Sequence, residues 1–224
     1  MLTLDNIKNY GEYIAVEAPH PLRTFSSAMH NPGYGEYQYF INRTVDISYN
    51  PLDAHEEMKQ FIQTSGYSLH QTVAMMTAVD MKFAFMDFYE DGDTSIVVLV
   101  TTGLGNAVDI TRSHEYAHPP RVGTINTFIF INGHLTDEAL IQGLCGAVEV
   151  KTKILSEHDI RDPQSGTIAT GTSTDSICIA STQTGERHEF GGSITKLGKL
   201  IGKGLYNTMN RSVESFLEYK KGNR

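Results

Sequence analysis

The residues best suited to chemistry lie in segment 166–176, whose sequence is GTIATGTSTDS. Glycines let a backbone approach a ligand closely, and hydroxyls next to a carboxylate supply donors, acceptors and a potential base. Thr170, Thr172 and Thr174 could bind or attack a carbonyl while Asp175 accepts a proton. The same residue types also suit a loop whose hydroxyls satisfy backbone groups before a strand, and both interpretations stay open.

Two further segments share this character, TTGLGNA at 101–107 and GTIN at 123–126. Each adjoins a β-branched apolar run, so all three segments are predicted to be loops at strand ends, where a rigid scaffold usually holds a site. Asn106 could donate to an oxyanion or a ligand carbonyl, or it could occupy a left-handed turn, which asparagine tolerates. The other candidates in these two segments are Thr102, Gly103, Thr124 and Asn126.

Three more places carry candidate residues. Glu149 lies in a predicted helix beside its apolar stripe, where partial burial would suit acid/base duty; the alternative is a solvated glutamate on the helix flank. Gly192, in the run Gly-Gly-Ser at 191–193, could present free amides to an anionic or carbonyl group. Ser27 and His30 lie in SSAMHN, another polar segment of small residues.

The composition is that of an ordinary globular protein. The chain has 224 residues, which predicts a single domain over 1–224. Its formal net charge of −8 argues against a nucleic-acid partner, because neutralising phosphates requires clustered Lys and Arg. The two cysteines, Cys145 and Cys178, each lie in an apolar segment, and we expect both to be buried, unpaired thiols of a reducing compartment.

The sequence predicts neither a membrane segment nor a resident metal. The longest apolar run, 96–100, is far too short to span a bilayer, and the N-terminal segment lacks the basic and apolar regions of a signal peptide. We therefore expect a cytoplasmic protein. No Cys/His cluster with zinc spacing occurs, and His114 and His118 precede two prolines, which favours a loop over a metal-binding helix.

Strands and helices are mixed along the chain. Strands are expected at 37–47, 124–131 and 176–180, and the Asp91-Gly92 pair predicts a hairpin between 82–89 and 95–100. This mixture indicates the α+β class, with mixed, largely antiparallel sheets covered by helices in a layered sandwich. The expected helices are 53–64, one that begins after the N-cap Thr136 and runs to about Leu155, and one that Ser193 opens. The apolar stripe expected along the last helix is Ile194, Leu197, Ile201, Leu205, Met209, Val213 and Phe216.

The last predicted helix contains three glycines, each of which costs about 1 kcal/mol relative to alanine. Gly198 and Gly202 are four residues apart and share a face, so something is expected to approach that face closely. Packing within the chain is the simpler explanation, with a nearby ligand second. The same face could equally serve a contact between subunits, so a homo-oligomer is compatible with the pattern.

Taken together, these segments resemble the adenosylcobinamide amidohydrolase (CbiZ) family of cobamide salvage. The resemblance runs in one order along nearly the whole chain, which makes it far more specific than any single motif. The matching stretches are SSAMHN (26–31), MMTAVDM (75–81), TTGLGNAVD (101–109), GTINTFIFIN (123–132), GAVEVKTKIL (146–155), GTIATGTSTDS (166–176) and GGSITKLGKLIG (191–202).

The resemblance implies hydrolysis of the amide that joins the corrinoid side chain of adenosylcobinamide to aminopropanol, which releases adenosylcobyric acid. Asp175 and Glu149 would take the acid/base tasks, and Asn106 and Thr124 would orient or polarise the carbonyl. The nucleophile is either an activated water or a hydroxyl. No cofactor is expected, because the cobalt arrives as part of the corrinoid. The residues expected to contact substrate are Thr102, Gly103, Asn126, Thr170, Thr172, Thr174, Gly192, Ser27 and His30.

Two functions of other classes fit the same loops. A non-enzymatic corrinoid carrier would use them for binding only and would return its ligand unchanged. An acyl- or group-transfer enzyme would use the hydroxyls on a small metabolite, and it would require a second substrate where a hydrolase requires only water.

Overall fold

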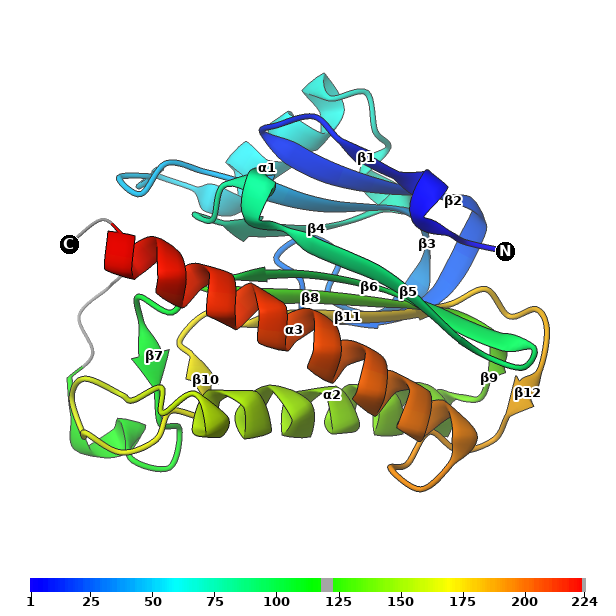
Figure 1. Cartoon of the computed structure of the whole chain (residues 1–224). Coiled ribbons are helices and arrows are strands. Elements are labelled where there is room, and N and C mark those ends of the chain that lie inside the picture. The colour runs from blue at the N-terminus through cyan, green and yellow to red at the C-terminus, as the bar shows by residue number, and fades with distance from the viewer. Residues whose placement is uncertain (118–122, 223–224) are drawn as a thin grey trace.

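The computed structural model describes residues 1–117 and 123–222. Its strands build one large sheet and two small two-stranded ribbons (Figure 1). The strands in chain order are β1 (Ile7–Asn9), β2 (Tyr13–Ser26), β3 (Gly33–Thr44), β4 (Thr72–Thr77), β5 (Phe85–Asp91), β6 (Thr94–Thr102), β7 (Ala107–Val108), β8 (Ile125–Asn132), β9 (His134–Leu135), β10 (Gly171–Thr172), β11 (Ser176–Ser181) and β12 (Arg187–His188).

The α-helices are α1 (Ala54–Thr64), α2 (Asp137–Glu157) and α3 (Lys196–Gly222). The predicted N-cap Thr136 is confirmed, since its side chain accepts from the Ala139 amide. Asp53 is the N-cap of α1, and its side chain accepts from two backbone amides. The third helix begins at Lys196 and not at Ser193, so the predicted start is wrong by one turn. Short 3-10 turns occupy Leu4–Asn6, Leu69–Gln71, Met81–Phe83 and Ser113–Glu115.

The strand order of the large sheet is β4-β3-β2-β11-β8-β6-β5, with β1 added beside β2. Two of its pairings, β3 with β4 and β8 with β11, are parallel, and the others are antiparallel. The predicted α+β class with a mixed, largely antiparallel sheet is therefore confirmed. The β5–β6 hairpin is also confirmed, with Asp91 paired to Thr94 and Gly92 at positive φ in the turn.

The sheet folds back on itself through the β2–β3 ribbon. The register between these strands shifts between Glu17 and Leu22, a stretch that contains Pro19 and Pro21. Prolines cannot donate to a ladder and are tolerated at such bulges, which bend the strands that carry them. The rings of Phe40 on β3 and Phe130 on β8 lie 4.9 Å apart. A flat sheet would separate these strands by about 14 Å, so the two halves of the sheet must face each other.

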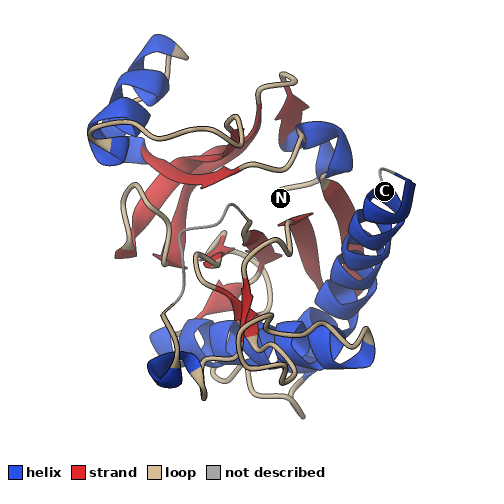
Figure 2. Ribbon diagram, turned by 90° about the vertical axis from the view of Figure 1, so that its left-hand side faces the viewer, coloured by secondary structure: helices blue, strands red, loops and turns tan. Residues whose placement is uncertain are grey.

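The result is four layers: α1, a first β-layer, a second β-layer, and the pair α2 and α3. Alternate residues of each strand point to opposite faces, so Ile41 packs under α1 while its neighbour Phe40 enters the core between the β-layers. Ile96 and Ile129 of the second β-layer pack against Ile201 and other residues of α2 and α3. Figure 2 shows the strands nearly end-on, forming an arc with the helices outside it.

The apolar stripe expected for α3 is largely confirmed. Leu197, Ile201, Leu205, Met209 and Val213 are all buried against the sheet. Ile194, which was expected to begin this stripe, precedes the helix and is 85% exposed. Both cysteines were expected to be buried and unpaired. Cys178 is buried, whereas Cys145 is exposed on α2, so the expected burial is wrong for Cys145; both thiols are free.

The two helical glycines Gly198 and Gly202 have different environments. A β-carbon on Gly198 would overlap the carbonyl oxygen of Gly192, whereas a β-carbon on Gly202 would meet open space. We expect Gly198→Ala to lower the free energy of unfolding by about 2–3 kcal/mol, because the clash is with backbone that cannot rotate away. Gly202→Ala is expected to raise it by about 1 kcal/mol through helix propensity. Denaturant unfolding of the two variants compares them, and equal effects would contradict this assignment.

Candidate functional site

The candidate site lies at one open end of the β-sandwich, which we call the sandwich mouth. Here β3, β4 and β6 end, while β8 and β11 begin. Figure 2 looks at the molecule from this end. Loops from five strand ends therefore meet in one place, and they include parts of the predicted loops 101–107, 123–126 and 166–176.

Three adjoining hollows open at the sandwich mouth. The aromatic cleft, of about 340 Å³, runs between the end of β6 and the C-terminal turns of α3. The hydroxyl pocket, of about 360 Å³, lies between the ends of β4, β8 and β11 and shares Ala78 and Gly123 with the cleft. A shallow polar depression of about 570 Å³ joins both along residues 45–49. Volumes of this size fall within the range of ligand pockets, about 300–1,000 Å³.

The hydroxyl pocket is lined by Thr124, Thr174 and Ser176, with Met29 and Met76 supplying apolar wall. The Thr124 hydroxyl lies 2.8 Å from the carbonyl oxygen of Thr174 and 3.2 Å from Oδ1 of Asn126. Thr174 is exposed and donates to the carbonyl of Gly123. These hydroxyls thus bind the 123–126 and 173–176 loops together and present oxygen atoms to the pocket.

Below the hydroxyl pocket, buried amides replace the apolar core. Nδ2 of Asn126 donates to Oδ1 of Asn42 at 2.7 Å and to the Met76 carbonyl at 3.0 Å. Asn42 in turn donates to the Thr101 hydroxyl at 2.9 Å. These three side chains are at most 1% exposed, and their bonds join the two β-layers. Both donors of the Asn126 amide are used within this network. Asn126 therefore lies beneath the pocket and is not part of its lining.

Glycines allow the two strand-end loops beside β6 and β8 to touch. The amide of Gly103 donates to the Thr124 carbonyl at 2.9 Å. A β-carbon on Gly123 would lie 2.5 Å from Oδ1 of Asn106, 2.8 Å from the Gly105 nitrogen and 3.0 Å from the Gly103 carbonyl oxygen. Gly123 also lines both the aromatic cleft and the hydroxyl pocket. This glycine contact therefore forms the partition between the two hollows.

Asn106 is buried against this partition. Its Nδ2 donates to the Ser173 hydroxyl at 2.7 Å, and its carbonyl accepts from the Ser173 amide. Its Oδ1 is buried without a hydrogen-bond partner among the described residues. The residue does not adopt positive φ, so the alternative of a left-handed turn is wrong. Asn106 instead links the 103–106 loop to the 166–176 loop.

Asp175 is held by four donors. One carboxylate oxygen accepts from the Ile125 amide at 3.0 Å and from the Thr172 hydroxyl; the other accepts from the Thr172 amide at 3.0 Å and from Nζ of Lys151 at 2.5 Å. The side chains of Asp175 and Lys151 are 15% and 16% exposed. A carboxylate offers about four lone-pair positions, so this group is saturated. The arrangement is suited to fixing loops in place and leaves no oxygen lone pair for a substrate proton.

Asp175 also faces away from the hydroxyl pocket. With Lys151 and Ile125 it lines a separate small hollow of about 150 Å³ on the α2 side of the sheet. Ser176 lines this hollow and the hydroxyl pocket alike, so one residue separates the two. Lys151 was not predicted as a partner of Asp175, although a lysine on the buried stripe of α2 was a signal for a buried charged partner.

The remaining loop residues form a lobe behind the sandwich mouth. Thr170 accepts from the Ile110 amide and bonds the Val108 carbonyl, beside the short β7–β10 ribbon. Two buried carboxylates, Asp109 and Asp162, connect the same loops and were not identified from the sequence. The hydroxyl of Thr167 is the main cause that lowers the pKa of Asp109. Burial opposes ionisation of Asp162, yet backbone amide donors keep the pKa of its carboxyl below the ordinary value.

Thr102 and Gly103, at the end of β6, line the aromatic cleft. Ser27 and His30 lie next to the site and are occupied by backbone contacts. The Ser27 hydroxyl accepts from the Ile177 amide at 3.0 Å, where β11 begins. Nε2 of His30 lies 2.9 Å from the Leu69 carbonyl oxygen. Met29, the residue before His30, lines the hydroxyl pocket.

Glu149 and Gly192 also lie away from the sandwich mouth. Glu149 is exposed on α2, so the expectation that it is buried is wrong. Gly192 precedes α3, and Figure 1 shows that this end of the helix lies beside β9 and β12, opposite the end near β7. The adjacent Gly191 amide donates to Oε1 of Gln142 at the start of α2. The glycines at 191–192 thus serve the packing of α3 against α2.

The described residues, 1–117 and 123–222, contain no group of three His, Cys, Asp or Glu side chains placed to share a metal ion. His118 lies outside the described residues, so the predicted loop at 114–120 is only partly visible. Within the same two ranges, no helix has the length and hydrophobicity that a membrane crossing requires.

The family model for adenosylcobinamide amidohydrolase (CbiZ) matches residues 2–220, nearly the whole chain. The chain is also 25% identical, over 91% of its length, to an uncharacterised ABC transporter ATP-binding protein of Bacillus subtilis (strain 168). It is 30% identical over 45% of its length to the uncharacterised protein MJ1613 of Methanocaldococcus jannaschii. These matches span 37% and 38% of the lengths of the two relatives.

Among solved structures, the PH0078 protein from Pyrococcus horikoshii OT3 aligns with 97% of this chain and 82% of its own. The TM-score of that alignment is 0.45 and the sequence identity is 11%.

Proposed function

The chain belongs to the adenosylcobinamide amidohydrolase family, and from this we propose that it hydrolyses the amide joining the side chain of adenosylcobinamide to aminopropanol. Adenosylcobyric acid and 1-aminopropan-2-ol are the products, and the cobalt enters as part of the substrate. The observation that carries the proposal is the convergence of three Gly/Thr loops, distant along the chain, at the sandwich mouth. A flat macrocycle with many amide side chains suits such a wide, multi-loop opening better than a narrow slot.

The hydroxyl pocket is our proposed position for the scissile amide. Amide hydrolysis requires a nucleophile, a donor to the developing oxyanion and a proton for the departing amine. A hydroxyl can redirect its proton between acceptors, so Thr124 can turn from the Thr174 carbonyl to the substrate carbonyl. Thr174 and Ser176 lie in the same lining and supply the hydroxyls that would attack or bind water.

The structure favours a different role for Asp175 from the one predicted. Its four lone-pair positions are filled, and its carboxylate faces the α2 side. We therefore propose that Asp175 is a positioning residue that fixes Ile125 and Thr172, the residues that begin β8 and end β10. Glu149, exposed on α2, is not assigned a part in the reaction.

The function is tested by incubating the purified protein with adenosylcobinamide in buffer and analysing the products by mass spectrometry. Adenosylcobyric acid and aminopropanol are expected in equal amounts without any second substrate. Recovery of unchanged ligand would instead indicate a corrinoid carrier, and dependence on an acceptor molecule would indicate group transfer. Intact-protein mass during turnover separates the two nucleophiles, since only attack by a hydroxyl leaves the corrinoid acyl group on the protein.

Replacement of Thr124 tests its contact with the carbonyl. Thr124→Val keeps the shape of the side chain and removes the donor, so kcat/KM is expected to fall about tenfold, which corresponds to one hydrogen bond of about 1.4 kcal/mol. Thr124→Ser retains the hydroxyl and is the matched control, with kcat/KM near that of the wild type. Equal losses in both variants would contradict a special role for the hydroxyl, because Thr124→Val loses the hydroxyl and keeps a methyl group, whereas Thr124→Ser does the reverse.

A further inference from the structure

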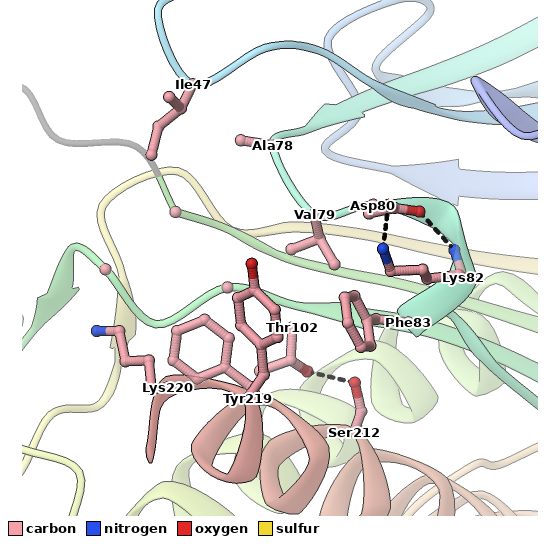
Figure 3. Close-up of a pocket in the computed structure, with 14 residues that line it drawn as sticks. Ile47, Ala78, Val79, Asp80, Lys82, Phe83, Thr102, Ser212, Tyr219 and Lys220 are labelled. Carbon is pink, nitrogen blue, oxygen red and sulfur yellow. Dashed lines mark hydrogen bonds and ion pairs between the residues drawn. The ribbon is translucent and has the colours of Figure 1, made fainter. Parts of the chain in front are cut away.

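The aromatic cleft is not used by the amide chemistry proposed above, yet three aromatic side chains line it. Its walls carry the rings of Phe83, Phe216 and Tyr219, from the 3-10 turn after β4 and from the end of α3. In Figure 3 the labelled rings of Phe83 and Tyr219 lie side by side along one wall of the cleft. Their centroids are 5.2 Å apart, with the planes inclined at 56°.

The cleft also has a few polar groups at defined places. At its floor the Ser212 hydroxyl donates to the Thr102 hydroxyl at 2.8 Å, and both residues are at most 2% exposed (Figure 3). At its rim the Asp80 carboxylate accepts from the Lys82 amide at 3.0 Å and pairs with the Lys82 ammonium at 2.9 Å. Apolar walls with a small number of convergent donors and acceptors are typical of a site for a small, largely flat ligand.

We propose that the aromatic cleft binds the adenosyl group of the substrate, with the adenine ring stacked on the aromatic walls. The proposal rests on the proposed function, because only an adenosylated corrinoid brings this group to the sandwich mouth. Purine rings stack on aromatic side chains, and their ring nitrogens and ribose hydroxyls can bond the Thr102 and Ser212 hydroxyls.

The position of the cleft supports one substrate occupying both hollows. The cleft and the hydroxyl pocket share Ala78 and Gly123, so only the glycine partition separates them. The cleft volume of about 340 Å³ is too small for a corrin macrocycle and fits a single appendage of it. The corrin would then lie across the mouth, with its adenosyl group on one side of Gly123 and its scissile side chain on the other.

The test compares two substrates in two cleft variants. Tyr219 is 53% exposed, so Tyr219→Ala is expected to fold normally, and Phe216→Ala removes the second wall. For adenosylcobinamide, kcat/KM should fall by roughly 5- to 150-fold, the range that corresponds to losing one base–aromatic stack. For aquacobinamide, which lacks the adenosyl group, kcat/KM should stay unchanged. Phe190→Ala, which alters an exposed ring at the opposite end of the molecule, is the control and should leave both values unchanged.

A binding measurement separates this inference from the proposed function. 5′-Deoxyadenosine is titrated into the wild-type protein by calorimetry, and its binding should be lost in Tyr219→Ala and kept in Phe190→Ala. Binding with this pattern in a protein that hydrolyses neither corrinoid would sustain the cleft and refute the hydrolase. Equal losses for the two corrinoids in Tyr219→Ala, or failure of 5′-deoxyadenosine to bind an active protein, would overturn the adenosyl site.

Discussion

Gly123→Ala should lower kcat/KM for adenosylcobinamide about 100-fold. The added β-carbon would lie 2.5–3.0 Å from Asn106 Oδ1 and from backbone atoms of Gly105 and Gly103. Two of these three atoms belong to the backbone, so no rotation of a side chain relieves the contact. The 103–106 loop must therefore move away from Gly123, and a shift of about 1 Å at a reacting centre can cost about 100-fold in rate. Steady-state kinetics on the folded variant measures the effect.

Gly146→Ala is the matched control for this substitution. Gly146 lies within α2, and a β-carbon there would meet open space. We expect unchanged kcat/KM and a free energy of unfolding about 1 kcal/mol higher, as helix propensity dictates. Wild-type turnover in a folded Gly123→Ala protein would show that the glycine partition does not shape the reacting site. Asn106→Ala in the Gly123→Ala background should restore little, because the two backbone contacts persist.

Local features of the fold could be predicted because they depend on neighbouring residues. The Asp-Gly pair at 91–92 indicated the β5–β6 hairpin, and Thr136 was a recognisable N-cap. Strand β2 was missed because Pro19 and Pro21 interrupt its pattern, and only the register shift opposite β3 makes them acceptable. The folding of one sheet into two facing layers rests on contacts such as Phe40 with Phe130, which no local pattern reveals.

The candidate site, like the fold, could be predicted from the sequence only where it depends on local features. The Gly/Thr composition of three segments, each next to an apolar run, was enough to predict loops at strand ends, where a site is usually held. The orientation of single side chains was harder to predict. Glu149 lies two residues after the buried Ala147, which rotates it about 200° around the helix and places it in solvent. The partner of Asp175 lies 24 residues away on α2, so the saturation of that carboxylate could not be predicted from its own segment.

The second large effect concerns the Asp175–Lys151 pair. Asp175→Asn should lower the free energy of unfolding by about 2–4 kcal/mol, because it leaves the Lys151 ammonium, 16% exposed, without its counter-ion. Lys151→Met should have a similar cost, since the carboxylate keeps its three other donors but loses the cation. In the double variant neither charge remains unpaired. Its loss should therefore be smaller than the sum of the single losses by about 1–3 kcal/mol in denaturant unfolding.

The kinetics of the same three variants distinguish a positioning residue from a catalytic base. If Asp175 fixes the strand ends, Asp175→Asn and Lys151→Met lower kcat to a similar extent, and the acid limb of the pH profile of kcat keeps its midpoint. If Asp175 were the proton acceptor, Asp175→Asn alone would abolish turnover and remove that limb, while Lys151→Met would remain active. The saturated carboxylate predicts the first pattern, because a group that accepts four hydrogen bonds must break one of them before it can take a proton from water or substrate.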